Sequence, residues 1–189
     1  GSEMCIRDRC EFVARVARAA KRGGELELEE KTRPLQIPPD VWLLFAPIKK
    51  ARTDFIVEKA TELGAARICP VQTDFTNAER IRQDRLQAHA VESAEQCGGT
   101  FVPEVEELRP LSRWLSSWDA GRRILWADES LVGAAAALSG AEPGPWAILI
   151  GPEGGFSPAE RDRLRALPFV LPVSLGPPIL RADTATVAT

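Results

Sequence analysis

The residues with the clearest chemical potential form one glycine-rich loop, residues 151–155, which reads Gly-Pro-Glu-Gly-Gly. It follows the apolar run 146–150, and glycine lets a backbone approach a ligand closely. Phosphate-binding P-loops end in Gly-Lys-Ser/Thr, whereas this loop has no lysine and carries Glu153. The loop therefore favours a ligand with positive charge or neutral hydrogen-bond donors, and a tight turn without a ligand is the equal alternative.

The residues after this loop are typical of the start of a helix. Ser157 is predicted to cap the helix, Pro158 to occupy its first position, and Glu160 to complete a capping box. Helix capping therefore explains Ser157 and Pro158. It does not explain the glycines, so the loop remains a candidate binding segment.

Strands and helices alternate along most of the chain, which predicts an α/β fold with a mostly parallel sheet and helices on both faces. The helix after the first of these strands is expected to carry one buried stripe and to stop at Gly64. The residues expected on or beside this stripe are Phe55, Ile56, Lys59, Ala60 and Leu63. We expect strands at residues 41–47, 67–71, 122–128, 146–150 and 169–175, and helices at 52–64, 80–97, 111–118, 130–138, 157–167 and from 179 onward.

Three loops at the ends of predicted strands are expected to meet. Ligands of such sheets bind outside the carboxyl ends of the strands. Besides the glycine-rich loop, the Ala-Asp-Glu-Ser segment 127–130 ends one strand, and Gly176 with the two prolines after it ends another. We therefore expect these three loops to converge on one pocket.

The N-terminal part lacks the alternation of strands and helices that is predicted for the rest of the chain. Residues 1–9 look like a non-native leader and are left out of the fold prediction. Residues 10–36 hold two strand-like segments, with a turn predicted at Gly23-Gly24, and such a hairpin is marginal in water unless it packs on something or belongs to a small β domain. A proline-rich stretch then places a domain boundary near Ile37, which leaves residues 37–189 as the main domain.

Composition excludes several classes of function. The chain has 189 residues, of which 44% are hydrophobic and 27% charged, and its formal net charge is -3. These values are typical of a globular protein and argue against a nucleic-acid binder that uses its whole surface, but not against a local basic site. No apolar run reaches membrane-spanning length. Four scattered cysteines and a single histidine, His89, predict reduced thiols in a cytoplasmic protein without a metal site.

Four ordered motifs carry a resemblance to a known family. Residues 149–160 (LIGPEGGFSPAE) and 173–185 (VSLGPPILRADTA) closely resemble SPOUT-class methyltransferases that methylate N3 of a uridine in small-subunit (16S) ribosomal RNA. Residues 49–71 and 90–99 resemble that family's upstream segments in the same order. The resemblance implies an S-adenosylmethionine-dependent enzyme with a C-terminal trefoil knot that acts as a homodimer on ribosomal RNA. It also implies a PUA-like β domain, of which residues 10–36 are the last strands.

The resemblance also implies roles for individual residues. Arg181 would stabilise negative charge on the uracil and Glu153 would hold the ligand or act on the proton, while surface ion pairing and loop capping are their structural alternatives. Lys49, Lys50 and Arg52 would meet RNA phosphates, unless they form only a solvated basic turn. The residues expected to bind S-adenosylmethionine are Ala127, Glu129, Ile150, Gly151, Pro152, Gly154, Gly155, Ser174, Leu175, Gly176, Ile179 and Leu180.

Departures from the family pattern keep two alternatives open. Phe75, Gly99 and Pro178 stand where the family usually has arginine, and the chain is expected to stop at Thr189 before the closing helix of the knot is complete. Loss of basic side chains weakens RNA binding. One alternative is therefore a catalytically weakened or inactive knotted protein that acts as an RNA-binding or dimeric scaffold. The other is an unknotted doubly wound domain that binds a different nucleotide.

Overall fold

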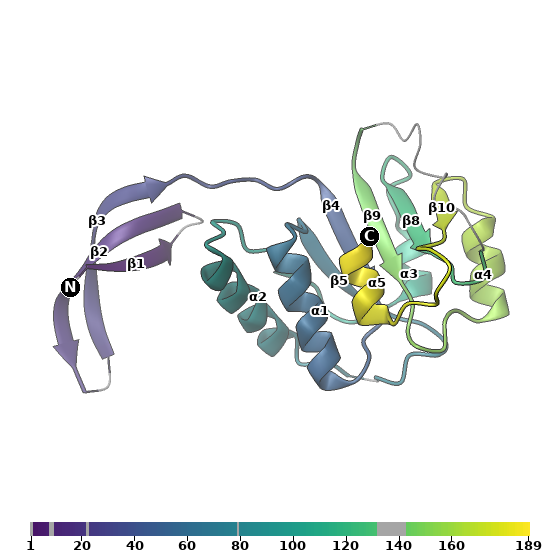
Figure 1. The fold of residues 1–189 in the computed structure, drawn as a ribbon, viewed down its shortest axis with the longest axis horizontal. Helices are drawn as coiled ribbons and strands as arrows, with labels where there is room; N and C mark the ends of the chain where they lie inside the picture. Colours follow the sequence, from purple (N-terminus) through teal and green to yellow (C-terminus); the bar gives the residue numbers. More distant parts are fainter. Residues whose placement is uncertain (1, 8–9, 22, 79, 132–142) are drawn as a thin grey trace.

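The computed structural model describes residues 2–7, 10–21, 23–78, 80–131 and 143–189. Within these ranges the chain forms a three-stranded sheet near the N-terminus and a seven-stranded sheet in a larger body (Figure 1). The two parts are joined by an extended stretch without regular secondary structure. The larger body contains every residue expected to form a site.

The seven-stranded sheet is parallel at every pairing. Its strands are hydrogen-bonded in the order β10-β8-β9-β4-β5-β6, and β7 also pairs with β5. This confirms the mostly parallel sheet, and only the two-residue strands β6 and β7 are too short for a sequence pattern to predict. The strands are β4 (Val41–Phe45), β5 (Arg67–Gln72), β6 (Glu104–Val105), β7 (Arg109–Pro110), β8 (Arg123–Ala127), β9 (Trp146–Ile150) and β10 (Val170–Val173).

Helices cover both faces of this sheet, as predicted. Helices α1, α2 and α5 pack on one face (Figure 1), whereas α3 and α4 pack on the other. The helix expected at 130–138 lies almost entirely outside the described residues, and Ser130 and Leu131 are not helical. The helices are α1 (Lys50–Glu62), α2 (Gln83–Cys97), α3 (Leu111–Ser116), α4 (Pro158–Arg165) and α5 (Ala182–Ala188).

The hydrophobic core consists of two clusters, one on each face of the sheet, and β4 in the middle of the sheet contributes to both. Side chains alternate between the two faces of a strand. Leu43 and Phe45 accordingly join the hydrophobic cluster under α1, α2 and α5, while Leu44 and Ala46 join the cluster under α3 and α4. The unbroken apolar sequence of β4 is thus explained by burial on both faces, which is typical of parallel sheets.

Two helix predictions need correction. On α1, Ile56 and Ala60 are buried as expected, but Phe55 is exposed and Leu63 is 62% exposed. The predicted stripe was therefore too wide, and packing of α2 and α5 determines which part of it is buried. The stop itself is right, since Gly64 follows the helix with a φ of 83°, a backbone conformation that favours glycine. The last helix begins at Ala182, so Ile179 to Arg181 belong to the preceding loop.

The N-terminal sheet differs from its prediction at the turn. Strands β1 (Ser2–Arg7), β2 (Cys10–Ala20) and β3 (Gly23–Arg33) are antiparallel, so part of the leader that was left out of the fold prediction is a strand. Gly23 and Gly24 do not form the turn but begin β3, where they pair with Ala20 and Ala19. The chain therefore reverses before the glycines, between Ala20 and Gly23.

The linker after β3 is tied to the larger body at the end of α2. The Gln36 amide donates to Thr100 Oγ1 at 2.9 Å, and this hydroxyl in turn donates to the Pro34 carbonyl at 3.2 Å. Thr100 is buried. These bonds anchor residues 34–36 where the domain boundary was predicted.

Candidate functional site

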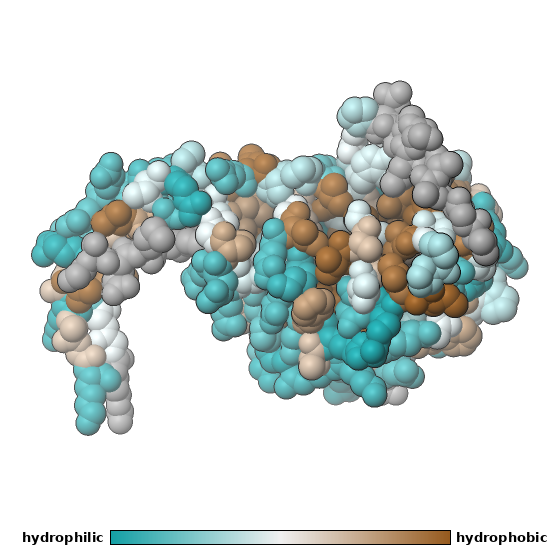
Figure 2. All heavy atoms as spheres, in the orientation of Figure 1, coloured by the Kyte–Doolittle hydropathy of each residue, from teal (hydrophilic) through white to brown (hydrophobic). Residues whose placement is uncertain are grey.

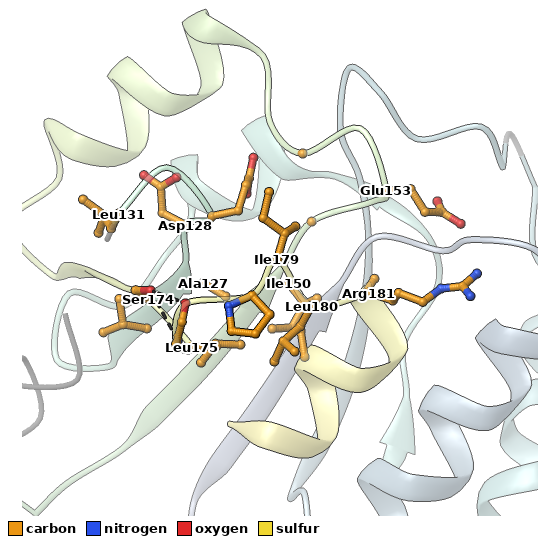
Figure 3. A pocket seen from close by; sticks show the side chains of 18 of the residues that line it. Ala127, Asp128, Leu131, Ile150, Glu153, Ser174, Leu175, Ile179, Leu180 and Arg181 are labelled. Carbon is orange, nitrogen blue, oxygen red and sulfur yellow. Dashed lines mark hydrogen bonds between the residues drawn. The ribbon is translucent and has the colours of Figure 1, made fainter. Parts of the chain in front are cut away.

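A pocket of about 380 Å³ lies beyond the carboxyl ends of three adjacent strands, β8, β9 and β10 (Figure 3). Each strand supplies one wall through the loop that follows it, at residues 127–131, 150–155 and 173–182. This volume falls within the usual range for small-molecule sites, roughly 300–1,000 Å³. The predicted convergence of the three loops is confirmed, although their expected roles in binding remain predictions.

The sequence prediction located the pocket residues well. All twelve residues expected to contact the cofactor line it, and so do Glu153 and Arg181. The pocket lining does not include the three residues expected to contact RNA, which are Lys49, Lys50 and Arg52. The pocket walls missed by the sequence argument are Asp128, Leu131, Val173, Pro177, Pro178, Ala182 and Ala185.

The glycine-rich loop owes its shape to close packing as well as to any ligand. A Cβ on Gly151 would lie 2.7 Å from the ring of Phe156, and a Cβ on Gly155 would lie 2.5 Å from Glu129 Oε1. Gly155 also has a φ of 68°, which side chains rarely tolerate. Position 155 favours glycine, because the backbone conformation is strained for any side chain and the Glu129 carboxylate would have to move to admit one.

The start of α4 holds this loop in place through the predicted capping box. Ser157 Oγ accepts from the Glu160 amide at 3.3 Å, and Glu160 Oε2 accepts from the Ser157 amide at 2.9 Å. The same residues bind the turn after β5: Ser157 Oγ donates to Asp74 Oδ2 at 2.5 Å, and the Asp74 amide donates to Glu160 Oε1 at 3.0 Å. The helix cap therefore also fastens a second loop to the rim of the pocket.

Asp128 is the main structural residue of the site that sequence reasoning missed. Its side chain is 0% exposed and accepts from Arg161 Nη1 at 2.7 Å and Arg165 Nη2 at 3.2 Å. The Ser130 amide and hydroxyl also donate to it, at 3.0 and 2.8 Å. Burial alone would raise the pKa of Asp128, but the bonds from Ser130, the charge of Arg161 and the hydrogen bond from Arg165 together outweigh it, so the pKa lies below its usual value.

Arg161 connects the loop after β8 to the start of α4. Besides Asp128, it binds Glu129 and donates from Nε to the Phe156 carbonyl at 3.0 Å. Glu129 is thus held by an ion pair at the pocket wall. Asp128 could have been noticed as the first polar residue after a buried strand, but no sequence signal distinguishes Arg161 from the other arginines of α4.

The loop after β10 is organised by Ser174 and by two apolar anchors. Ser174 Oγ donates to the Gly176 carbonyl at 3.2 Å and accepts from the Gly176 amide at 3.3 Å. Leu175 and Leu180 pack against the core under α1 and α5, while Ile179 between them is 79% exposed. The loop therefore presents an apolar floor and one free apolar side chain at the rim (Figure 3).

Glu153 and Arg181 carry the free charges of the pocket. Neither side chain forms a hydrogen bond or ion pair with any described residue, and both extend away from the apolar floor (Figure 3). The structural pairings considered for Arg181 do not occur. Asp183 instead accepts from Arg52 Nη1 at 3.1 Å, and Glu160 is occupied by the amides of Asp74 and Ser157.

The three basic residues expected to meet RNA have different surroundings. Lys49 and Lys50 are exposed at the start of α1, whereas the pairing of Arg52 with Asp183 joins α1 to α5. Arg52 is therefore ion-paired within the protein, and contact of all three residues with RNA stays a prediction. Gly99 lies at the end of α2, and Pro178 lies in the pocket wall.

Fold and pocket together define the class of protein, an α/β domain with a small-ligand site beyond the carboxyl ends of its parallel strands. Residues 35–189 match the family model described as an RNA methyltransferase domain, and the chain belongs to that family. Ribosomal RNA small subunit methyltransferase E of Rickettsia conorii is 27% identical over 183 residues, which cover 94% of this chain and 73% of the relative.

Two further comparisons agree with this assignment. The protein of the same name from Bacillus subtilis is 30% identical over 174 residues, covering 85% of this chain and 67% of the relative. The crystal structure of ribosomal RNA small subunit methyltransferase E from Neisseria gonorrhoeae, bound to S-adenosyl methionine, matches with a TM-score of 0.88 at 23% identity. This match covers 100% of the present chain and 80% of that chain, and at this identity it shows the fold.

Two general features of the described residues complete the description. No helix among them is long and apolar enough to cross a membrane. The same residues contain no group of three or more histidine, cysteine, aspartate or glutamate side chains placed to hold a metal ion.

Proposed function

We propose that the protein is a cytoplasmic, S-adenosylmethionine-dependent methyltransferase that modifies N3 of a uridine in small-subunit ribosomal RNA. The observation that carries the proposal is the meeting of three strand-end loops at one pocket in a chain of the RNA methyltransferase family. The named relatives support the RNA substrate, and the structure from Neisseria gonorrhoeae supports the cofactor.

The pocket residues fit S-adenosylmethionine chemically. The apolar floor formed by Ile150, Leu175 and Leu180 suits an adenine ring, and the backbone groups of the loops can bind its polar atoms. The described lining contains no lysine that would repel the positive charges of the cofactor. Asp128 and Glu129 are already neutralised by Arg161 and shape the wall instead.

The cofactor, when bound, supplies an electrophilic methyl group. Uridine N3 carries a proton near neutral pH, so methylation requires that the N3–H bond break, that N3 bond to the methyl carbon, and that this carbon lose its bond to sulfur, which would leave as a neutral thioether. The guanidinium of Arg181 is always charged and can stabilise negative charge on the uracil oxygens. We assign acceptance of the N3 proton to the Glu153 carboxylate, which has no competing ion pair among the described residues.

A trefoil knot in the C-terminal region belongs to the same proposal. Strand β10 lies at the edge of the sheet beside β8, yet the chain that leaves it returns past the 151–155 loop to α5. Helix α5 then packs on α1 and β9, on the face opposite α4. This path supports threading of the C-terminal segment past the glycine-rich loop. An experimental chain trace that includes residues 132–142 would test it.

Residues 10–36 are proposed to be the last strands of a small PUA-like RNA-binding domain. Strands β2 and β3 bury few side chains, among them Ala14 and Glu11. A sheet with so little core requires a partner. A second candidate function, a scaffold that binds RNA or dimerises without catalysis, is favoured by Phe75, Gly99 and Pro178 at positions where basic residues were expected.

Calorimetric titration with S-adenosylmethionine tests the pocket assignment. The parent chain is expected to bind one equivalent per chain. Gly155→Ala should bind about tenfold more weakly or worse, because relief of a strain of order 1–3 kcal/mol and displacement of Glu129 would move the loop away from the conformation that lines the pocket. Gly144→Ala is the matched control, since a Cβ at Gly144 meets nothing within 4 Å. Equal affinity of Gly155→Ala and the parent chain would contradict the assignment.

Methyl transfer to small-subunit RNA then separates the enzyme from the scaffold. Transfer of a radiolabelled methyl group, located at uridine N3 by nucleoside mass spectrometry, supports the enzyme. Cofactor and RNA binding without transfer supports the scaffold. Absence of cofactor binding excludes both assignments of the pocket and favours an unknotted domain that binds another ligand.

We also propose a homodimer formed through the C-terminal region. Apolar residues gather around α5 (Figure 2), and a second hollow of about 430 Å³ there is lined by residues that include Leu63 and Val187, both exposed. Light scattering at micromolar concentration is expected to give twice the chain mass of 20.7 kDa. Val187→Glu should lower this mass toward the monomer, and Val91→Glu on α2 should not. A monomeric parent chain would exclude the dimer.

A further inference from the structure

Phe75 is a partly exposed aromatic residue beside the rim of the pocket. Its side chain is 46% exposed, and a Cβ on Gly154 would lie 3.3 Å from its Cβ and 3.6 Å from Cγ and Cδ2. Gly154 itself lines the pocket. Phe75 therefore lies against the outer side of the glycine-rich loop, and the absent side chain at Gly154 makes room for it.

The turn that carries Phe75 is firmly held. Asp74 is fastened to the cap of α4 by two hydrogen bonds, as described above. On the other side, the Thr73 amide donates to Thr76 Oγ1 at 2.9 Å, and the Thr76 amide donates to the Thr73 carbonyl at 3.1 Å. Residues on both sides of Phe75 are thus fixed, so ordering this ring on a ligand requires little additional loss of backbone freedom.

The ring of Phe75 has no stacking partner among the residues that the structure describes. Among the described residues it forms no aromatic or cation–π contact, whereas Trp42, Trp114 and Trp126 all have such partners. Ile179, also exposed, is a second apolar side chain at the same pocket. A rigid aromatic ring with free surface beside a ligand pocket is the arrangement on which unpaired nucleobases stack.

We propose that Phe75 is a positioning residue whose ring stacks on the target uracil at the mouth of the pocket. This proposal rests on the proposed function. It assigns the stacking contact with the base to Phe75, which does not line the pocket. Enzymes that modify a base must take it out of the stack, and an aromatic side chain then replaces the lost neighbour. Lys49 and Lys50 would supply the phosphate contacts.

Stacking and phosphate binding predict different behaviour. Loss of a stacking side chain weakens binding only when a base is present and leaves the salt dependence unchanged. Loss of a phosphate contact weakens binding to any backbone and reduces the salt dependence. A support for the glycine-rich loop would instead alter cofactor affinity. The three roles are therefore distinguishable.

The experiment measures binding of fluorescein-labelled oligouridylate, and of an abasic RNA of the same length, to the 189-residue chain. Phe75→Leu keeps an apolar side chain but removes the aromatic face. It is expected to weaken binding of oligouridylate by about 5- to 150-fold. Binding of the abasic RNA, the salt dependence and the affinity for S-adenosylmethionine should be unchanged. Phe75→Trp should restore binding of oligouridylate.

Phe55→Leu is the matched control, because Phe55 is an exposed phenylalanine on α1 that lines neither described pocket. It should bind oligouridylate like the parent chain. Equal binding of oligouridylate by Phe75→Leu and the parent chain would overturn the proposal, and so would equal weakening for the abasic RNA. A fall in cofactor affinity or thermal stability without base dependence would assign Phe75 to loop support. Because these readouts need no catalysis, failure of methyl transfer would be recognised separately, in the parent chain.

Discussion

Arg181→Ala is expected to slow single-turnover methylation by about 100- to 1,000-fold while leaving the affinity for S-adenosylmethionine nearly unchanged. The guanidinium forms no ion pair with any described residue and extends from the rim of the pocket (Figure 3). If it stabilises charge that develops on the uracil oxygens, its contribution arises mainly in the transition state. The loss should therefore appear in the rate at saturating substrate.

Arg181→Lys refines this prediction. Lysine keeps the positive charge but loses the planar fork with which arginine can bind two oxygens together. It should therefore recover only part of the lost rate. Arg113→Ala on α3, an exposed arginine on the opposite face of the sheet, is the control and should methylate at the rate of the parent chain. A weakened cofactor affinity with an intact saturated rate would make Arg181 a binding residue.

Asp128→Ala is expected to lower the free energy of unfolding by about 3 kcal/mol. The buried carboxylate binds Arg161 and Arg165, and removal of one partner of such a group leaves charge without compensation. We expect the lower end of the usual range, because Arg161 is 19% exposed and keeps its pairing with Glu129. Urea unfolding would measure the difference.

The pH dependence of unfolding provides a second measurement on Asp128. Because its pKa is lowered in the folded state, its contribution is fully present above the ordinary value of about 4. The contribution is lost as the pH falls from there through the lower pKa of the folded protein. Asp128→Asn should remove this part of the acid dependence, up to about 1.4 kcal/mol per pH unit.

The control for both measurements is Asp162→Ala, an exposed aspartate on α4 without a described side-chain partner. Its effect should stay within about 0.5 kcal/mol. If Asp128→Ala unfolded like this control, the contacts of Asp128 with the two arginines would contribute nothing measurable to stability.

Much of the fold was predictable because apolar periodicity is local. The unbroken run of β4 indicated a strand buried on both faces, and β9 begins and ends where predicted. The cap of α4 was also predictable, since Ser157, Pro158 and Glu160 act within a single turn of helix. Their sequence spacing alone determines which atoms can meet.

The predictions are wrong where contacts between segments far apart in the chain determine the local structure. Phe55 and Leu63 belong to the apolar sequence of α1, but packing of α2 and α5 selects a face beside them. The glycines at 23 and 24 suggested a turn, whereas strand pairing with β2 places them in β3. In both cases local preference is small compared with the area that tertiary contacts bury.

The sequence by itself determined the class of the fold and the three loops at the strand ends, because alternating strands and helices predict a parallel sheet and each loop directly follows its strand in the chain. The order of the strands within the sheet came only from the tertiary structure. Only the tertiary structure showed which charged side chains form ion pairs and which have no described partner. Arg52, Arg161 and Arg181 look alike in sequence, yet the first two are paired with Asp183 and Asp128 and the third has no described partner. Ion pairs between residues far apart in the chain depend on three-dimensional distance, which no local pattern encodes.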